Sequence, residues 1–109
     1  MAAITVQDVG ADGLADVTFS NSSASDTVTP GVRVGGYELA PVFVIISNGD
    51  DSPHNVAIGD ADPVEVANGD TAVFPIYSEG IGDGSVTITS DDPTSQTIAA
   101  IRLVGALGS

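Results

Sequence analysis

The fold of this chain is decided at residues 42–46, where the sequence reads Val-Phe-Val-Ile-Ile before Ser47 and the polar loop 48–53. Five consecutive apolar residues leave neither face of a β-strand polar, whereas a strand with one solvated face alternates apolar and polar residues. We therefore predict a central strand that is covered on both sides. The sandwich core would cover one face, and another layer or another subunit would cover the second.

Short segments of β-strand character lie on both sides of this stretch. Most alternate apolar with polar residues, and glycine, proline or an Asn-Gly pair separates them. The predicted segments are 3–7, 16–19, 55–58, 63–67, 71–76, 85–90 and 96–104, with two briefer candidates at 27–29 and 32–34 and a polar loop over 20–26. No stretch has the periodicity of an amphipathic helix. The pattern predicts an all-β fold, a single antiparallel β-sandwich of jelly-roll or immunoglobulin-like type with seven or eight short strands.

The length and composition fit one domain. A chain of 109 residues with 42% hydrophobic residues can build a single core, made mostly of Val, Ile, Leu and Ala because aromatic residues are few. We expect one domain over residues 1–109, with loose ends near 1–3 and 105–109. Neither a signal peptide nor an apolar run of the roughly 20 residues that a membrane helix needs is visible.

The charge of the chain restricts its partners. Fifteen acidic residues, twelve of them Asp, stand against only Arg33 and Arg102, and the net charge is −13. Such a chain repels nucleic acid phosphates and anionic lipids, so we expect neither nucleic acid nor a membrane as a partner. An excess of Asp together with a complete absence of Lys is typical of proteins from extreme halophiles, where high salt screens the repulsion.

The sequence offers little for catalysis. His54 is the only histidine, there is no Cys, and no Gly-x-Ser-x-Gly turn is present. Because His54 follows Pro53 in a polar loop, we expect it to be a surface residue. We predict no catalytic residue, no cofactor and no enzymatic activity.

Carboxylates gather in several predicted loops, where they could bind a hard cation. None of these loops matches the twelve-residue calcium loop, and each supplies few ligands, so we predict no specific metal site. The candidate ligands, if any, are Asp50, Asp51, Asp60 and Asp62, with Asp83 and the pair Asp91-Asp92 as further loop acids.

One cation on the last strand has two interpretations. Arg102 shares a strand face with Ile98 and Ala100, so its guanidinium must reach the rim of the sandwich. It then pairs with an Asp, which we favour, or meets a partner chain. The residues predicted as interface candidates are Val42, Phe43, Val44, Ile45, Ile46 and Arg102.

The order of motifs from about residue 42 to residue 103 resembles a family of small head proteins of tailed viruses. These motifs are Val42-x-Val44, Asn48, Pro53, Val56-x-Ile58, Val64–Ala67 with Gly69, Phe74-Pro75, Asp83-Gly84-x-Val86-x-Ile88 and Thr97-Ile98-Ala99-Ala100-Ile101-Arg102-Leu103. The ending Ile101-Arg102-Leu103 is the most specific part of the resemblance.

The resemblance implies a capsid decoration or cement protein. Such a protein is a β-sandwich on the outer capsid surface, bound to the major capsid protein and often a trimer or other small homo-oligomer, with no catalytic residues. The acidity of this chain would suit a virus of a halophilic archaeon. An alternative is a carbohydrate- or surface-binding sandwich with calcium-dependent loops, although the absence of Trp disfavours sugar stacking. Another virion part, such as a turret, fibre base or tail component, remains open as well.

Overall fold

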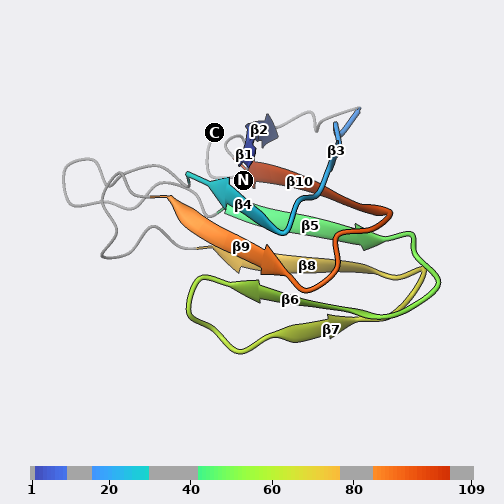
Figure 1. Ribbon diagram of the computed structural model, residues 1–109. Coiled ribbons are helices and arrows are strands. Elements are labelled where there is room, and N and C mark those ends of the chain that lie inside the picture. Colours follow the sequence, from blue (N-terminus) through green and yellow to red (C-terminus); the bar gives the residue numbers. More distant parts are fainter. Residues whose placement is uncertain (1, 10–15, 30–41, 77–84, 104–109) are drawn as a thin grey trace.

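The structure is a computed structural model that describes residues 2–9, 16–29, 42–76 and 85–103 (Figure 1). These residues form strands, turns and loops, and no helix occurs among them. Accordingly, none of the described segments is a helix of the length and apolar character needed to cross a membrane.

Ten strands form two five-stranded sheets. The first sheet contains, in spatial order, β1 (Ala2–Ile4), β4 (Ser25–Val28), β9 (Val86–Ser90), β6 (His54–Ile58) and β7 (Val64–Val66). The second sheet contains β2 (Val6–Val9), β10 (Gln96–Leu103), β5 (Val42–Asn48) and β8 (Thr71–Ile76), and β3 (Ser20–Asn21) pairs with β10. The predicted all-β sandwich is confirmed, with ten strands in the described ranges where seven or eight were expected.

Both sheets contain parallel as well as antiparallel strand pairs, and the parallel pairs come from residues 2–9. β1 runs parallel to β4 in the first sheet, and β2 runs parallel to β10 in the second. The predicted strand over 3–7 thus changes sheet at Thr5, which no sheet contains. Ile4 is buried in the core and Val6 packs against it, so one alternating run supplies an apolar side chain to each sheet. Where a loose end near residues 1–3 was expected, the structure has β1 from Ala2 onward.

Most other strands lie close to their predicted positions. β5, β6, β7, β8, β9 and β10 match the predictions to within two residues at each end. The predicted strand over 16–19 does not form, and the supposed loop over 20–26 contains β3 and the start of β4. The predictions for 32–34 and for the tail at 105–109 lie outside the described residues.

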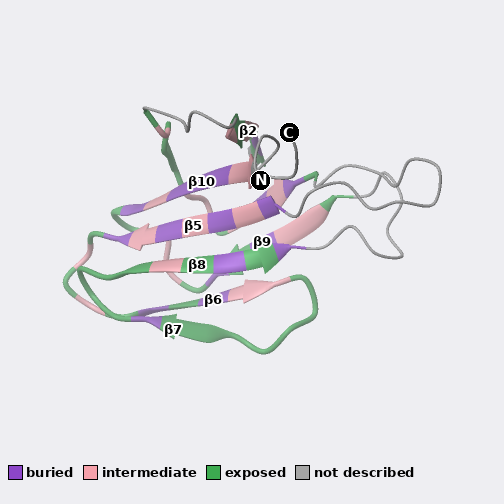
Figure 2. Cartoon of the chain, turned by 180° about the vertical axis from the view of Figure 1, so that it is seen from behind, coloured by how far each residue is buried: buried purple, intermediate pink, exposed green. Residues whose placement is uncertain are grey.

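The core lies between the two sheets and is made of aliphatic side chains from both. It comprises Ile4, Val28, Val42, Val44, Ile46, Val56, Val66, Phe74, Ile76, Ile88, Ile98 and Ala100. β5 contributes most regularly, because every second residue from Val42 to Asn48 is buried, an alternation visible in Figure 2. Each fully buried aliphatic side chain of this kind stabilises the fold by about 1.5–3 kcal/mol.

The two faces of β5 differ in burial. Val42, Val44 and Ile46 are 0% exposed, whereas Phe43 and Ile45, which point to the other side, are only half-buried. Within the described chain, the expected cover on both sides is therefore complete on the inner face and incomplete on the outer face. The outer face of β5 is the first candidate for a functional surface.

Candidate functional site

Apolar side chains form a continuous surface on the outer side of the second sheet. Residues directly opposite each other in an antiparallel pair point to the same side of the sheet. Ile45 lies opposite Ala99 of β10 and Val73 of β8. In the adjacent row, Phe43 lies opposite Ile101 of β10 and Pro75 of β8. We call this surface the apolar face; it comprises Phe43, Ile45, Val73, Pro75, Ala99 and Ile101.

The apolar face carries no charge. Val73 is 58% exposed and Pro75 is exposed; Phe43, Ile45 and Ile101 are half-buried, and Ala99 is buried (1% exposed). The rows continue with neutral polar residues: Gln7 lies beside Ile101, and the row after Ile45 consists of Asn21, Thr97, Ser47 and Thr71. Eleven residues without a single charge occupy these three rows, in a chain whose net charge is −13. An uncharged apolar surface of this kind is a candidate docking surface.

The outer side of the first sheet has the opposite character. Its outward residues are mostly polar, namely Ser25, Thr27, Thr87, Thr89, Asn55 and Glu65, with Ala3 and Ala57 as exceptions. Thr89, Asn55 and Glu65 are exposed. Val64 on the edge strand β7 is 47% exposed, but it lies opposite the buried Val56 and not on this outward side. The outward side of the first sheet is therefore suited to water, whereas the outward side of the second sheet carries larger apolar side chains.

The structure divides the predicted interface candidates into two groups. Val42, Val44 and Ile46 belong to the core of the chain itself, whereas Phe43 and Ile45 lie on the apolar face. Arg102 lies at the rim, where its Nε and Nη2 atoms donate to Asp8 Oδ1 at 3.1 and 2.9 Å. Asp8 is its register partner on β2. The pairing of Arg102 with an Asp at the rim is thus confirmed.

The free edge of the second sheet is poorly suited to strand addition. In the described part of the chain β8 is the last strand after β5. The Asn48 N–H donates to the Asp70 carbonyl, so by alternation along the ladder the backbone N positions of Val73 and Pro75 point away from β5. Proline has no N–H, and Pro75 therefore interrupts the edge. A partner is better accommodated on the apolar face than along β8.

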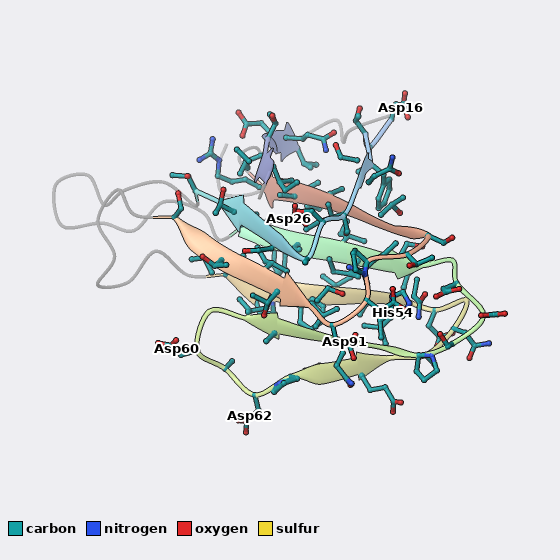
Figure 3. All side chains as sticks on the ribbon, viewed as in Figure 1. Asp16, Asp26, His54, Asp60, Asp62 and Asp91 are labelled. Atoms are coloured by element: carbon teal, nitrogen blue, oxygen red, sulfur yellow. The ribbon has the colours of Figure 1, made fainter. Side chains whose placement is uncertain are left out.

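A second candidate site surrounds His54, and here the expectation of a surface residue was wrong. His54 begins β6 and its side chain is 0% exposed. The ring Nδ1 lies 2.9 Å from Gln96 Oε1, and Nε2 lies 3.0 Å from Asp50 Oδ2. Figure 3 shows His54 at the end of the sandwich where the β5–β6 and β9–β10 loops meet. The loop position misled the prediction because two loops close over the ring.

The β9–β10 loop and the strand residues at its two ends supply the remaining polar groups around the ring. Asp92 Oδ2 lies 3.7 Å from His54 Nε2. On the other side of the ring, Gln96 Oε1 also accepts a hydrogen bond from the Ser90 hydroxyl at 3.2 Å, and both residues are buried. We call the five residues Asp50, His54, Ser90, Asp92 and Gln96 the His54 site.

Short backbone contacts hold the two loops together at this site. Gly49 N–H donates to the Ser95 carbonyl at 2.9 Å, and a Cβ at position 49 would lie only 2.9 Å from the same oxygen, so a side chain does not fit there. Ser95 adopts a φ of 54°, in the left-handed region that non-glycine residues rarely occupy. The loops thus approach each other closely, and this approach brings Asp50 and Asp92 to the same ring nitrogen.

The electrostatics of the His54 site favour a positive charge at the ring. Burial lowers the pKa of His54, but hydrogen bonds to Gln96 and Asp50 and the charges of Asp92 and Asp50 outweigh burial and hold that pKa above its ordinary value. The hydrogen bond with His54 lowers the pKa of Asp50, and hydrogen bonds from Thr94 lower the pKa of Asp92. Two ionised carboxylates therefore face Nε2.

Of the loop acids named as candidate ligands, the structure brings Asp50 and Asp92 to this site. Asp50, His54 and Asp92 offer ligand atoms within 4.8 Å of one another, and no second group of three or more such side chains converges among residues 2–9, 16–29, 42–76 and 85–103. Asp51, Asp60 and Asp62 are exposed and lie outside the site, and Asp83 is outside the described residues. Asp91, the neighbour of Asp92, instead accepts hydrogen bonds from the backbone and side-chain nitrogens of Asn55.

Comparison of the chain with protein-family models, with curated proteins and with solved structures finds no match in any of the three. The candidate functions therefore depend on the two sites described above and on the sequence.

Proposed function

We propose that this chain is a non-enzymatic virion structural protein, a decoration or cement protein on the outer surface of an icosahedral capsid. The observation that carries the proposal is the apolar face, an uncharged surface over β10, β5 and β8 in a chain of net charge −13. The kind of assembly is proposed from the resemblance of residues 42–103 to small head proteins of tailed viruses. It would be a small homo-oligomer, with a trimer favoured, bound to the major capsid protein.

The physical argument concerns where apolar surface remains exposed. A strand as apolar as β5 fills the core with Val44 and its inward neighbours, and still presents Ile45 and Phe43 on the other side. Docking of the apolar face would remove these side chains from water at about 25 cal/mol per Å². It would desolvate no charged group, which is the main cost of burying an acidic surface. The acidic remainder of the chain would stay in solvent.

The His54 site lacks the arrangement of a serine nucleophile with a histidine base. The Ser90 hydroxyl donates to Gln96 Oε1 and not to a ring nitrogen, so His54 is not arranged as the base for that serine. The ring is enclosed, and both of its nitrogens already contact side-chain oxygens. A nucleophile activated by a nearby general base is therefore not formed around the ring.

A charge placed on the apolar face tests the docking proposal. We expect Ile45→Asp to abolish homo-oligomer formation, followed by light scattering at about 2 M salt, where charge repulsion is screened. The same variant should fail to bind capsids that were assembled without the chain. Thr89→Asp is the matched control, because it places the same charge on an exposed strand residue of the first sheet.

The comparison of the two variants decides the result. If Thr89→Asp weakens attachment as much as Ile45→Asp, the effect is general repulsion and the apolar face is not the contact. A wild-type chain that is monomeric and also fails to bind capsids would contradict the proposal as a whole. A mass-spectrometric inventory of separated heads and tails distinguishes a decoration protein from a turret, fibre base or tail component.

A carbohydrate-binding module would need a hollow in which a sugar can bind. A shallow hollow on the first sheet is lined by Asn55, Ala57, Pro63, Thr89, Ser90 and Asp91. None of these residues is aromatic, so the hollow lacks the ring on which a sugar usually stacks. Calorimetry with calcium and a panel of glycans would detect such binding, and saturable heat would favour the module over the virion protein.

Salt dependence tests the halophilic part of the proposal. Raising NaCl from about 0.1 to 2 M should increase the melting temperature by about 10 °C, corresponding to roughly 2 kcal/mol for a domain of this size. The physical reason is screening of like charges in a chain of net charge −13. Differential scanning calorimetry at each salt concentration measures the shift.

A charge-reduced variant shows whether screening is the cause. Replacement of five exposed acids by amides should flatten the salt dependence and raise the melting temperature at low salt; the set is Asp16, Asp51, Asp60, Asp62 and Asp70. An equally steep response in this variant would assign the effect to salting-out, and a flat response in the wild type would remove the halophilic inference.

A further inference from the structure

We propose that the His54 site binds a divalent transition-metal ion of the zinc type, with His54 Nε2, Asp50 and Asp92 as ligands from the chain. This inference does not depend on the proposed function, because the site lies in the loops at one end of the sandwich and not on the apolar face.

The geometry of the three ligand atoms fits a single small ion. Nε2 of His54 lies 3.0 Å from Asp50 Oδ2 and 3.7 Å from Asp92 Oδ2. Ligands bound at about 2.1 Å to a tetrahedral ion lie roughly 3.4 Å apart, and the two separations from Nε2 fall on either side of this value. All three ligand atoms lie within 4.8 Å of one another, so binding the ion would draw the carboxylates together.

The histidine ring is held in the orientation that a metal ligand requires. Its Nδ1 contacts Gln96 Oε1, which also accepts a hydrogen bond from the Ser90 hydroxyl, and all three side chains are buried. The Nδ1 atom therefore carries a proton, and Nε2 is directed at the carboxylates. Metal-bound histidines characteristically donate their second N–H to such an oxygen, which fixes the ring and strengthens the ligand.

The carboxylate side of the ring is the side from which an ion can reach Nε2. The burial is graded: His54 is enclosed, whereas the side chains of Asp50 and Asp92 are 18% and 45% exposed. An ion and a water ligand can therefore enter from the carboxylate side.

The ligand set determines the kind of metal. Calcium and magnesium prefer sites made of oxygen atoms only, and three ligands are too few for calcium. One imidazole nitrogen with two carboxylates suits zinc and neighbouring late first-row divalent ions. The net charge of −13 also raises the local concentration of any divalent cation. Bound between the β5–β6 and β9–β10 loops, the ion would cross-link two loops that are distant in sequence.

Zinc titration of the full chain tests the inference, after removal of metals with EDTA and in about 1 M sodium nitrate to screen non-specific attraction. We expect one Zn²⁺ per chain by calorimetry and a higher melting temperature, with no such response to Ca²⁺. Because His54 is the only histidine, its ring proton signals in the NMR spectrum report on the site directly and should shift in a saturable manner. Asp92→Asn should weaken zinc affinity by more than the roughly 10- to 100-fold that loss of an outer hydrogen bond costs.

The variant and its control are chosen so that folding is not in question. Asn at position 92 keeps the oxygen that accepts the Thr94 N–H, and Asp62→Asn removes the same charge at an exposed position outside the site. Asp62→Asn should bind zinc as the wild type does. Absence of saturable binding, unmoved His54 signals, or equal affinity in the two variants would overturn the proposal.

Discussion

Val44→Asp should leave the chain unfolded at 25 °C. Val44 is 0% exposed, lies at the centre of β5 and has Ala100 and Phe74 as its neighbours in the ladder, so the introduced carboxylate would have no polar partner. An unpaired buried charge costs several kcal/mol, and removal of the valine side chain adds the loss of its packing. This sum is comparable with the 5–15 kcal/mol that stabilises a typical domain. Far-ultraviolet circular dichroism and thermal melting measure the outcome.

Ile45→Asp, one residue further along the same strand, should remain folded. Its side chain points to the apolar face, where Ala99 and Val73 are its neighbours and solvent is accessible. We expect a loss of about 1 kcal/mol and a cooperative melt, because an exposed charge keeps its hydration. Unfolding of both variants would show that the outer side of β5 belongs to the core of the chain, and the docking proposal would lose its structural support.

The contrast between Val44 and Ile45 also shows how far the sequence could predict the fold. Alternation and turn residues located β5, β8, β9 and β10 because these strands form the continuous part of the core. The apolar run at 42–46 correctly indicated a central strand, flanked by β10 and β8. Which of its two sides faces the core depends on register, and the register is fixed only when the other sheet packs on it.

The mixed sheets lay beyond sequence reasoning for a physical reason. Residues 3–7 were predicted as one short strand, yet the chain crosses between the sheets at Thr5 and pairs in parallel on both sides. A parallel partner is distant in sequence and leaves no local turn signal, so neither β4 nor β10 could be predicted as a partner. The strand over 16–19 was predicted from alternation alone, which does not guarantee a pairing partner.

The His54 site shows a similar limit. Asp50 and His54 lie four residues apart and were visible as loop residues, but Gln96 is 42 residues from His54 in the sequence. Only the pairing of β5 with β10 and of β6 with β9 brings the two loops together. The one available signal was the Asp91-Asp92 pair beside a second turn, and composition made this pair unremarkable in a chain with twelve Asp residues.

Asn48→Asp is expected to cost about 3–5 kcal/mol, although it changes only a single side-chain amide to a carboxyl. Asn48 is 1% exposed and ends β5. Its Nδ2 donates to the carbonyls of Ser52 and Val66 at 2.9 and 3.0 Å, and its Oδ1 accepts the Asp50 N–H at 3.0 Å. A carboxylate keeps the acceptor but loses both donors, so it would place a buried charge against two carbonyl oxygens.

Asn68→Asp is the matched control, since it makes the same chemical change at an exposed turn residue of the β7–β8 connection. It should change the free energy of unfolding, measured by denaturant titration, by less than about 0.5 kcal/mol. Acidification to about pH 4 should recover part of the loss in Asn48→Asp, because a protonated carboxyl can donate one of the two missing hydrogen bonds. Equal midpoints for the two variants would mean that the β5–β6 loop does not depend on Asn48. Asp50 would then owe its position beside His54 to the Gly49–Ser95 contact and to its hydrogen bonds within the loop with Asp51 and Ser52.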